Sequence, residues 1–186
     1  MKLRKVFLTC FLLILSVGCN SQAEQKIEQK NEFLEVRINR WTALEGGETL
    51  VLHKINEEWS ARLLGDGSRF GCLYQESVQP KYGWEIFWLS LQKEGLLEIP
   101  DGNYADKGWL DGSGFVVEVY HQNKLKRYSF FVPEEMKTER ETQILRIGDL
   151  INQEFGTPVF VADYDRGKVG EYLIGKCKDF RKSEEK

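Results

Sequence analysis

The chain has 186 residues, of which 41% are hydrophobic and 30% are charged, and its formal net charge is −3 at pH 7. This composition is typical of a globular protein and excludes a disordered chain. An acidic balance also argues against nucleic-acid binding, which depends on cationic patches, and the length allows one ordinary domain with a hydrophobic core.

The first 18 residues are predicted to be an export signal. Lys2, Arg4 and Lys5 give a cationic start, and residues 6–17 carry no charge. This apolar block is about a dozen residues long, whereas a helix that spans a bilayer needs roughly 20. No second long apolar run follows, so the sequence predicts no transmembrane helix after the signal.

The signal ends in Leu15-Ser16-Val17-Gly18-Cys19, which resembles the lipobox of bacterial lipoproteins. The resemblance covers the leader alone. It implies cleavage between Gly18 and Cys19, a diacylglycerol on the Cys19 thiol, and an acyl chain such as palmitate on the new amino terminus. An ordinary secretory signal cut nearby, or an uncleaved anchor, is the alternative.

The lipoprotein resemblance implies a place in the cell envelope, attached to a membrane, because two or more acyl chains anchor a protein stably. Residue 20 is Asn and not the Asp that retains lipoproteins at the inner membrane, so the outer membrane is expected if the source has two. Loss of residues 1–18 removes three cations and leaves 23 Lys and Arg against 29 Asp and Glu, a net charge of −6.

A polar segment separates the signal from the domain. Ala23 and Ile27 are the only apolar side chains in residues 20–32, too few for this segment to fold alone. The predicted organisation is a signal peptide at 1–18, a lipidated Cys19 and tether at 19–32, one globular domain at 33–180 and a charged tail at 181–186.

Strands are predicted in the first half of the domain. Leu34, Val36 and Ile38 alternate with polar residues, which is the pattern of a half-buried strand. Turns are predicted at residues 45–47 and 65–67. Because such short turns cannot hold the crossovers that parallel strands need, an antiparallel meander is expected. The predicted strands are residues 34–38, 50–55, 59–64 and 70–74.

Two helices and a hairpin are predicted in the second half. A four-residue apolar stripe at i, i+3, i+4 and i+7 starts at Trp84 and indicates a helix that ends near Gly95. Thr138 and Glu141 form a capping box for the second helix, which ends at Gly156. Strands at 115–120 and 125–132 form the hairpin between them, and residues 157–180 show two apolar bursts without a clear period.

The sequence therefore predicts an α+β fold, in which an antiparallel sheet made of the meander and the hairpin packs two amphipathic helices on one face. Trp84 and Trp88 are expected in the core. Tyr104 and Trp109 lie in a Gly- and Asp-rich loop, where aromatic side chains are candidates for a recognition surface.

No catalytic motif, cofactor site or metal site is predicted. The chain has two histidines, His53 and His121, at a predicted strand end and a hairpin tip. His-Glu-x-x-His, Gly-x-Ser-x-Gly and phosphate-loop patterns are missing from the sequence. Residues 163–167 begin like a calcium loop but lack its terminal Glu, so a polar turn is expected there.

The cysteine count predicts one disulfide. Cys10 leaves with the signal and Cys19 is used for lipid, which leaves Cys72 and Cys177 in a compartment where disulfides persist. A bridge would attach the C-terminal segment to the fourth strand. The alternative is that Cys72 is a small buried group and Cys177 a free thiol.

Two functions follow from these observations. The first is a non-catalytic binding module for an envelope protein or polymer, including an inhibitor or immunity protein. The second is an envelope hydrolase that uses paired carboxylates. A flat patch with exposed Tyr104 and Trp109 would favour the binding module, and a cleft with two convergent carboxylates would favour the hydrolase. The candidate carboxylates are Asp101, Asp111, Asp163 and Asp165.

Overall fold

The computed structural model describes residues 32–42, 46–67, 72–104, 113–131, 138–161 and 165–184. All of them belong to one compact unit, Asn31–Lys186. No helix among the described residues is both long and apolar enough to cross a membrane.

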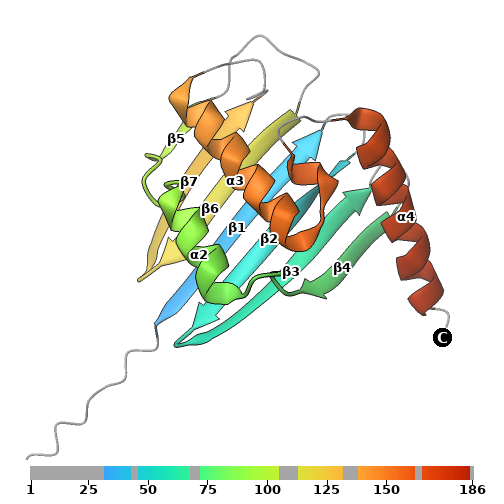
Figure 1. The fold of residues 1–186 in the computed structure, drawn as a ribbon, viewed down its shortest axis with the longest axis horizontal. Helices are drawn as coiled ribbons and strands as arrows, with labels where there is room; N and C mark the ends of the chain where they lie inside the picture. Colours follow the sequence, from blue (N-terminus) through green and yellow to red (C-terminus); the bar gives the residue numbers. More distant parts are fainter. Residues whose placement is uncertain are drawn as a thin grey trace, which may run out of the picture. The chain divides into compact units, whose positions relative to one another are not determined.

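A seven-stranded sheet forms one layer of this unit, in the order β4-β3-β2-β1-β6-β7-β5 (Figure 1). Every neighbouring pair is antiparallel except β5 and β7, which run parallel. The predicted meander is β1 to β4, the predicted hairpin is β6 and β7, and pairing of β1 with β6 joins them. The strands are β1 (Phe33–Thr42), β2 (Gly46–Ile55), β3 (Glu58–Gly67), β4 (Cys72–Val78), β5 (Gly102–Tyr104), β6 (Ser113–His121) and β7 (Lys124–Phe131).

Helices form the second layer and pack on one face of the sheet (Figure 1). They are α2 (Trp84–Lys93), α3 (Glu139–Phe155), the short 3₁₀ helix η2 (Pro158–Phe160) and α4 (Arg166–Glu184). The predicted capping box of Thr138 and Glu141 is present at the start of α3, and Gly156 ends α3 with a φ of 70°. The α+β fold is confirmed, with one long helix more than predicted.

The hydrophobic core fills the space between the two layers. Side chains at alternate positions of the central strands, such as Ile38, Leu50 and Leu63, are almost fully buried against Phe87 of α2 and Ile147 of α3. Burying one such side chain contributes roughly 1.5–3 kcal/mol. The alternation therefore determines which face of the sheet the helices cover.

The turn predicted at residues 65–67 is wrong, because these residues are the last three of β3. Gly65 pairs with Tyr74 of β4, and a Cβ at Gly65 would coincide with the Tyr74 ring. The glycine is needed here for close approach of an aromatic ring and not for a turn. Similarly, Gly46 and Gly47 begin β2, while Glu45 lies outside the described residues.

The C-terminal helix α4 was not predicted, and the charged tail expected at 181–186 is helical up to Glu184. Val169, Leu173 and Cys177 are buried at steps of four residues, which is one face of a helix. The structure pairs Cys177 with Cys72 of β4 as a disulfide, with Cα atoms 5.9 Å apart, as the cysteine count predicts.

Candidate functional site

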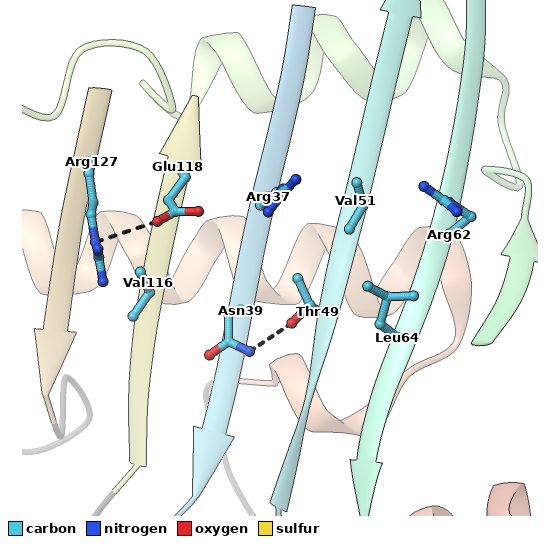
Figure 2. Close-up of a pocket in the computed structure, with 9 residues that line it drawn as sticks. All are labelled: Arg37, Asn39, Thr49, Val51, Arg62, Leu64, Val116, Glu118 and Arg127. Atoms are coloured by element: carbon cyan, nitrogen blue, oxygen red, sulfur yellow. Dashed lines mark hydrogen bonds and ion pairs between the residues drawn. The ribbon is translucent and has the colours of Figure 1, made fainter. Parts of the chain in front are cut away.

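The sheet face opposite the helices carries a shallow hollow of about 470 Å³ (Figure 2). None of the helices that the structure describes lies on this face (Figure 1). The residues that line the hollow come from five neighbouring strands. They are Arg37, Asn39, Thr49, Val51, Arg62, Leu64, Val116, Glu118 and Arg127.

Strand register arranges these residues in two rows across the sheet. Directly paired residues point to the same side, on strands about 4.8 Å apart. The first row runs through Arg127, Glu118, Arg37, Val51 and Arg62. The second row runs through Val116, Asn39, Thr49 and Leu64.

Three arginines and one carboxylate give the hollow a positive balance. Glu118 Oε1 lies 3.6 Å from Arg127 Nε. Arg37 Nε donates a hydrogen bond of 2.6 Å to Glu35 Oε1, just outside the hollow. Arg62, by contrast, has no hydrogen bond or ion pair from its side chain within the described part of the chain. Its guanidinium is therefore available to an anionic group.

Val51 lies between Arg37 and Arg62 and forms an apolar floor (Figure 2). Its side chain is only 4% exposed, because the two arginines lie on either side of it. An anionic group placed here would contact two guanidinium groups over a surface that offers little water. Such partial desolvation strengthens charged hydrogen bonds relative to those made in open water.

Glu35 connects the hollow to His53. Its second oxygen, Oε2, lies 2.8 Å from His53 Nε2. Partial burial alone would raise the pKa of Glu35, but hydrogen bonds from His53 and Arg37 outweigh burial and hold the pKa below its ordinary value. Glu35 therefore remains an anion that orients Arg37, and His53 is a part-buried partner of Glu35.

Aromatic side chains border the second row. Asn39 Nδ2 donates to Thr49 Oγ1 at 2.7 Å, and the next outward residue of β1 is Trp41, whose ring lies 5.8 Å from that of Phe131. A Cβ on Gly114 would be 2.6 Å from the Trp41 indole. Gly114 thus allows Trp41 to pack against the strand beside the hollow.

Arginine supplies all the Lys and Arg charge on this face of the described strands, although the chain has 16 Lys and 10 Arg. The described strands contain three lysines, Lys54 of β2 and Lys124 and Lys126 of β7, and strand alternation turns all three to the other face. Lys126 bonds the Leu97 carbonyl, and Lys54 lies over Trp59 on the helix side. Protein interfaces are enriched in arginine and aromatic residues and depleted in lysine. The composition of this face follows that pattern.

A second polar cluster is buried under the helices around Glu48. Glu48 accepts hydrogen bonds from the hydroxyls of Tyr74 and Thr157, and from Tyr172 at 3.0 Å. Arg40 of β1 lies directly opposite Glu48 of β2 in the strand register, and the Arg40 guanidinium lies 4.4 Å from the centre of the Phe115 ring. Burial raises the pKa of Glu48.

The Glu48 cluster connects β2, β4, α4 and Thr157, the residue before η2, so its contacts hold the layers together. The sequence contains a signal that could have predicted it. Glu48 falls on the same side of β2 as Leu50 and Leu52, so a carboxylate occupies an inward position and needs hydrogen-bond donors from elsewhere in the chain.

Comparison with protein-family models, curated proteins and solved structures finds no significant match to this chain.

Tyr104 is a packing residue in this structure. Its ring stacks on Phe130 at 4.9 Å, and the Arg140 guanidinium lies 5.2 Å from the ring centre. The Tyr104 hydroxyl donates to the Pro100 carbonyl at 3.0 Å. The second candidate for recognition, Trp109, lies outside the described residues.

Two of the four candidate carboxylates are described, and both bond to backbone amides. Asp101 Oδ1 accepts from the Arg127 N–H at 2.9 Å. Asp165 Oδ1 accepts from the N–H groups of Gly167 and Lys168, which caps α4, and the Lys168 amide is the main reason for the lowered pKa of Asp165. Asp111, Asp163 and Cys19, the residue predicted to carry the lipid, lie outside the described residues.

No cluster of three His, Cys, Asp or Glu side chains suited to a metal ion occurs within the described ranges. His121 lies 3.7 Å from Glu32 at the β6 to β7 hairpin. Gln122 and Asn123, which follow it, both have positive φ angles, as a tight hairpin turn requires.

Proposed function

We propose that the protein is a lipid-anchored, non-catalytic binding module of the cell envelope, and that it binds its partner through the uncovered face of the sheet. The partner is a protein or polymer of the envelope. Inhibitor and immunity proteins are special cases of such a module. The membrane is the outer one if the source has two.

One observation carries this proposal: a hollow lined by arginines lies on the face that the described helices leave open. Within the described part of the chain no carboxylate shares the Arg62 guanidinium, and Trp41 and Phe131 lie at the border of the hollow. Arginine and tryptophan are among the residues that contribute most to protein interfaces when they are desolvated. A protein partner with an acidic side chain opposite Arg62 and Arg37 fits this surface.

The alternative is an envelope hydrolase that uses paired carboxylates. Asp101 and Asp165 are bonded to the backbone of β7 and α4, which favours a structural role for both. The alternative therefore depends on Asp111 and Asp163. Cleavage of an envelope polymer by the purified protein, abolished by Asp111→Asn with Asp163→Asn, would favour it.

Photocrosslinking in intact cells tests the proposed function. A photoreactive amino acid is placed at Leu64 in the hollow and, in a second variant, at Lys178 on the exposed side of α4. We expect one dominant protein attached through position 64 and not through position 178. Equal products from both positions, or none from either, would contradict a binding role for the open face.

A further inference from the structure

Helix α2 has apolar side chains on two sides. Phe87 and Leu91 pack into the core. On the other side, Ile86 and Leu89 are 57% and 63% exposed, and Tyr82, which precedes the N-cap Gly83, is 56% exposed. We define these three residues as the α2 ridge. Exposed apolar residues on a helix and on the turn before it are a feature of surfaces that contact a membrane or a partner.

The α2 ridge begins near the end of the sheet at which the tether joins the domain. The Trp84 ring stacks on Trp59 at 5.9 Å, and Trp59 is one residue from Glu58, which pairs with Ile55 at the start of β3. Ile55 in turn pairs with Phe33, the first residue of β1. Figure 1 shows the start of β1 and the start of α2 at the same end of the sheet.

The tether limits how far this end can lie from the proposed lipid. Thirteen residues separate Cys19 from Phe33, and fully extended they span about 45 Å. A surface held this close to a bilayer has a high effective concentration. A weak apolar contact, which would not bind membranes alone, is then sufficient to orient the domain.

We propose that the α2 ridge rests on the lipid surface and so directs the hollow on the opposite sheet face away from the membrane. This inference rests on the proposed lipid anchor and adds an orientation to it. Apolar side chains of an interfacial helix enter the boundary between headgroups and acyl chains, and a tyrosine suits that boundary because it is apolar with a polar tip.

Lysines at both ends of the ridge fit this orientation. Lys81 precedes it, with Nζ 4.9 Å from the centre of the Tyr82 ring, and Lys93 lies in the last turn of α2. Their long stems allow the ammonium groups to reach headgroup phosphates while the ridge is in contact with lipid. Glu85 partly offsets this charge, so we expect the apolar contact to matter more than lipid charge.

A second copy of the chain fits the ridge less well than lipid does. A stable protein interface buries roughly 800 Å² on each partner, which three side chains cannot supply. A lipid surface needs no shape complementarity, and the tether supplies proximity. The observations therefore favour lipid as the occupant.

A vesicle experiment tests the orientation without the natural anchor. Residues 20–186 contain the whole compact unit with its own core. They are attached through an N-terminal histidine tag to phosphatidylcholine vesicles that contain a nickel-chelating lipid. Leu89→Cys on the ridge and Gln75→Cys on the open sheet face are each labelled with a polarity-sensitive fluorophore. We expect a blue shift and quenching by nitroxide-labelled lipid at position 89 and neither at position 75.

Ile86→Glu in the Leu89→Cys protein should abolish that shift while the melting temperature stays unchanged, because Ile86 is exposed. No shift at position 89, or the same shift at both positions, would overturn the proposal. A blue shift at position 89 in the absence of vesicles, together with a doubled mass of the protein in solution, would overturn the proposal and show that a second copy of the chain covers the ridge. Because the tag replaces Cys19, none of these outcomes depends on whether the natural chain is lipidated or on whether the hollow binds its partner.

Discussion

Glu48 is the most deeply buried carboxylate among the residues that the structure describes. Three hydroxyl groups, from Tyr74, Thr157 and Tyr172, donate hydrogen bonds to it. These bonds favour the charged form, but loss of hydration outweighs them and raises the pKa of Glu48 above the ordinary value of 4.5. The cluster is therefore sensitive to pH.

The stability of the protein is expected to fall as pH rises from about 4.5 through the raised pKa of Glu48. In that range the folded state binds more protons than the unfolded state. Each further unit of pH therefore lowers the free energy of unfolding by about 1.4 kcal/mol at most. Glu48→Gln imitates the protonated acid and should remove this fall. Urea unfolding of both proteins between about pH 4 and about pH 8 measures it, and identical pH profiles would contradict the raised pKa.

Two glycines should respond in opposite ways to replacement by alanine. A methyl group at Gly65 would collide with the Tyr74 ring, so Gly65→Ala should lower the free energy of unfolding by roughly 1–3 kcal/mol. Gly175, inside α4, has no atom within 4 Å of the added Cβ, and Gly175→Ala should raise that energy by up to about 1 kcal/mol. Chemical denaturation measures both, and loss of stability in both variants would contradict the open space beside Gly175.

At the scale of elements, most strands and two helices could be predicted because their signals are local. Alternation in β1 and the capping box of α3 need only a few neighbouring residues. α4 was missed because its apolar face is sparse and Gly167, Gly170 and Gly175 lower its helix propensity. Packing of Leu173 and the link at Cys177 stabilise it instead.

The hollow could not be predicted, because it depends on pairing between strands far apart in sequence. Arg37 is beside Glu118 only because β1 pairs with β6, and beside Val51 only because β2 folds back on β1. A register shift of one residue would turn each side chain to the opposite face. Local sequence patterns determine which side chains of a strand point to the core, but they do not determine which strands are neighbours in the sheet.

The disulfide between β4 and α4 should hold the C-terminal helix on the sheet. It closes a loop of 105 residues, for which the chain-entropy model gives about 4–5 kcal/mol as an upper value. Thiol titration of denatured, unreduced protein from an oxidising compartment should find no free thiol in residues 20–186. Reduction should lower the melting temperature by several degrees, whereas two reactive thiols per chain would exclude the bridge.

For the molecule as a whole, the proposed envelope location requires a lipid at Cys19. Cys19→Ser should release the protein from the membrane fraction or leave an uncut precursor, because no other acyl acceptor is proposed. Cell fractionation measures how much of the protein is in the membrane fraction, and its mass shows whether the signal has been cut. A Cys19→Ser protein that is processed and membrane-bound like the original would contradict the anchor but would leave the function of the hollow untouched.

The proposed function requires that the open sheet face bind the partner through its arginines. The most direct measurement starts with the partner protein that is identified by crosslinking at position 64. The affinity of this partner for the Arg62→Glu variant is compared with its affinity for the original protein, and Lys178→Glu is a control with the same change of charge. We predict at least a tenfold loss of affinity for Arg62→Glu, about 1.4 kcal/mol or more, and no loss for Lys178→Glu. Unchanged affinity of Arg62→Glu, or an equal loss in both variants, would contradict the account.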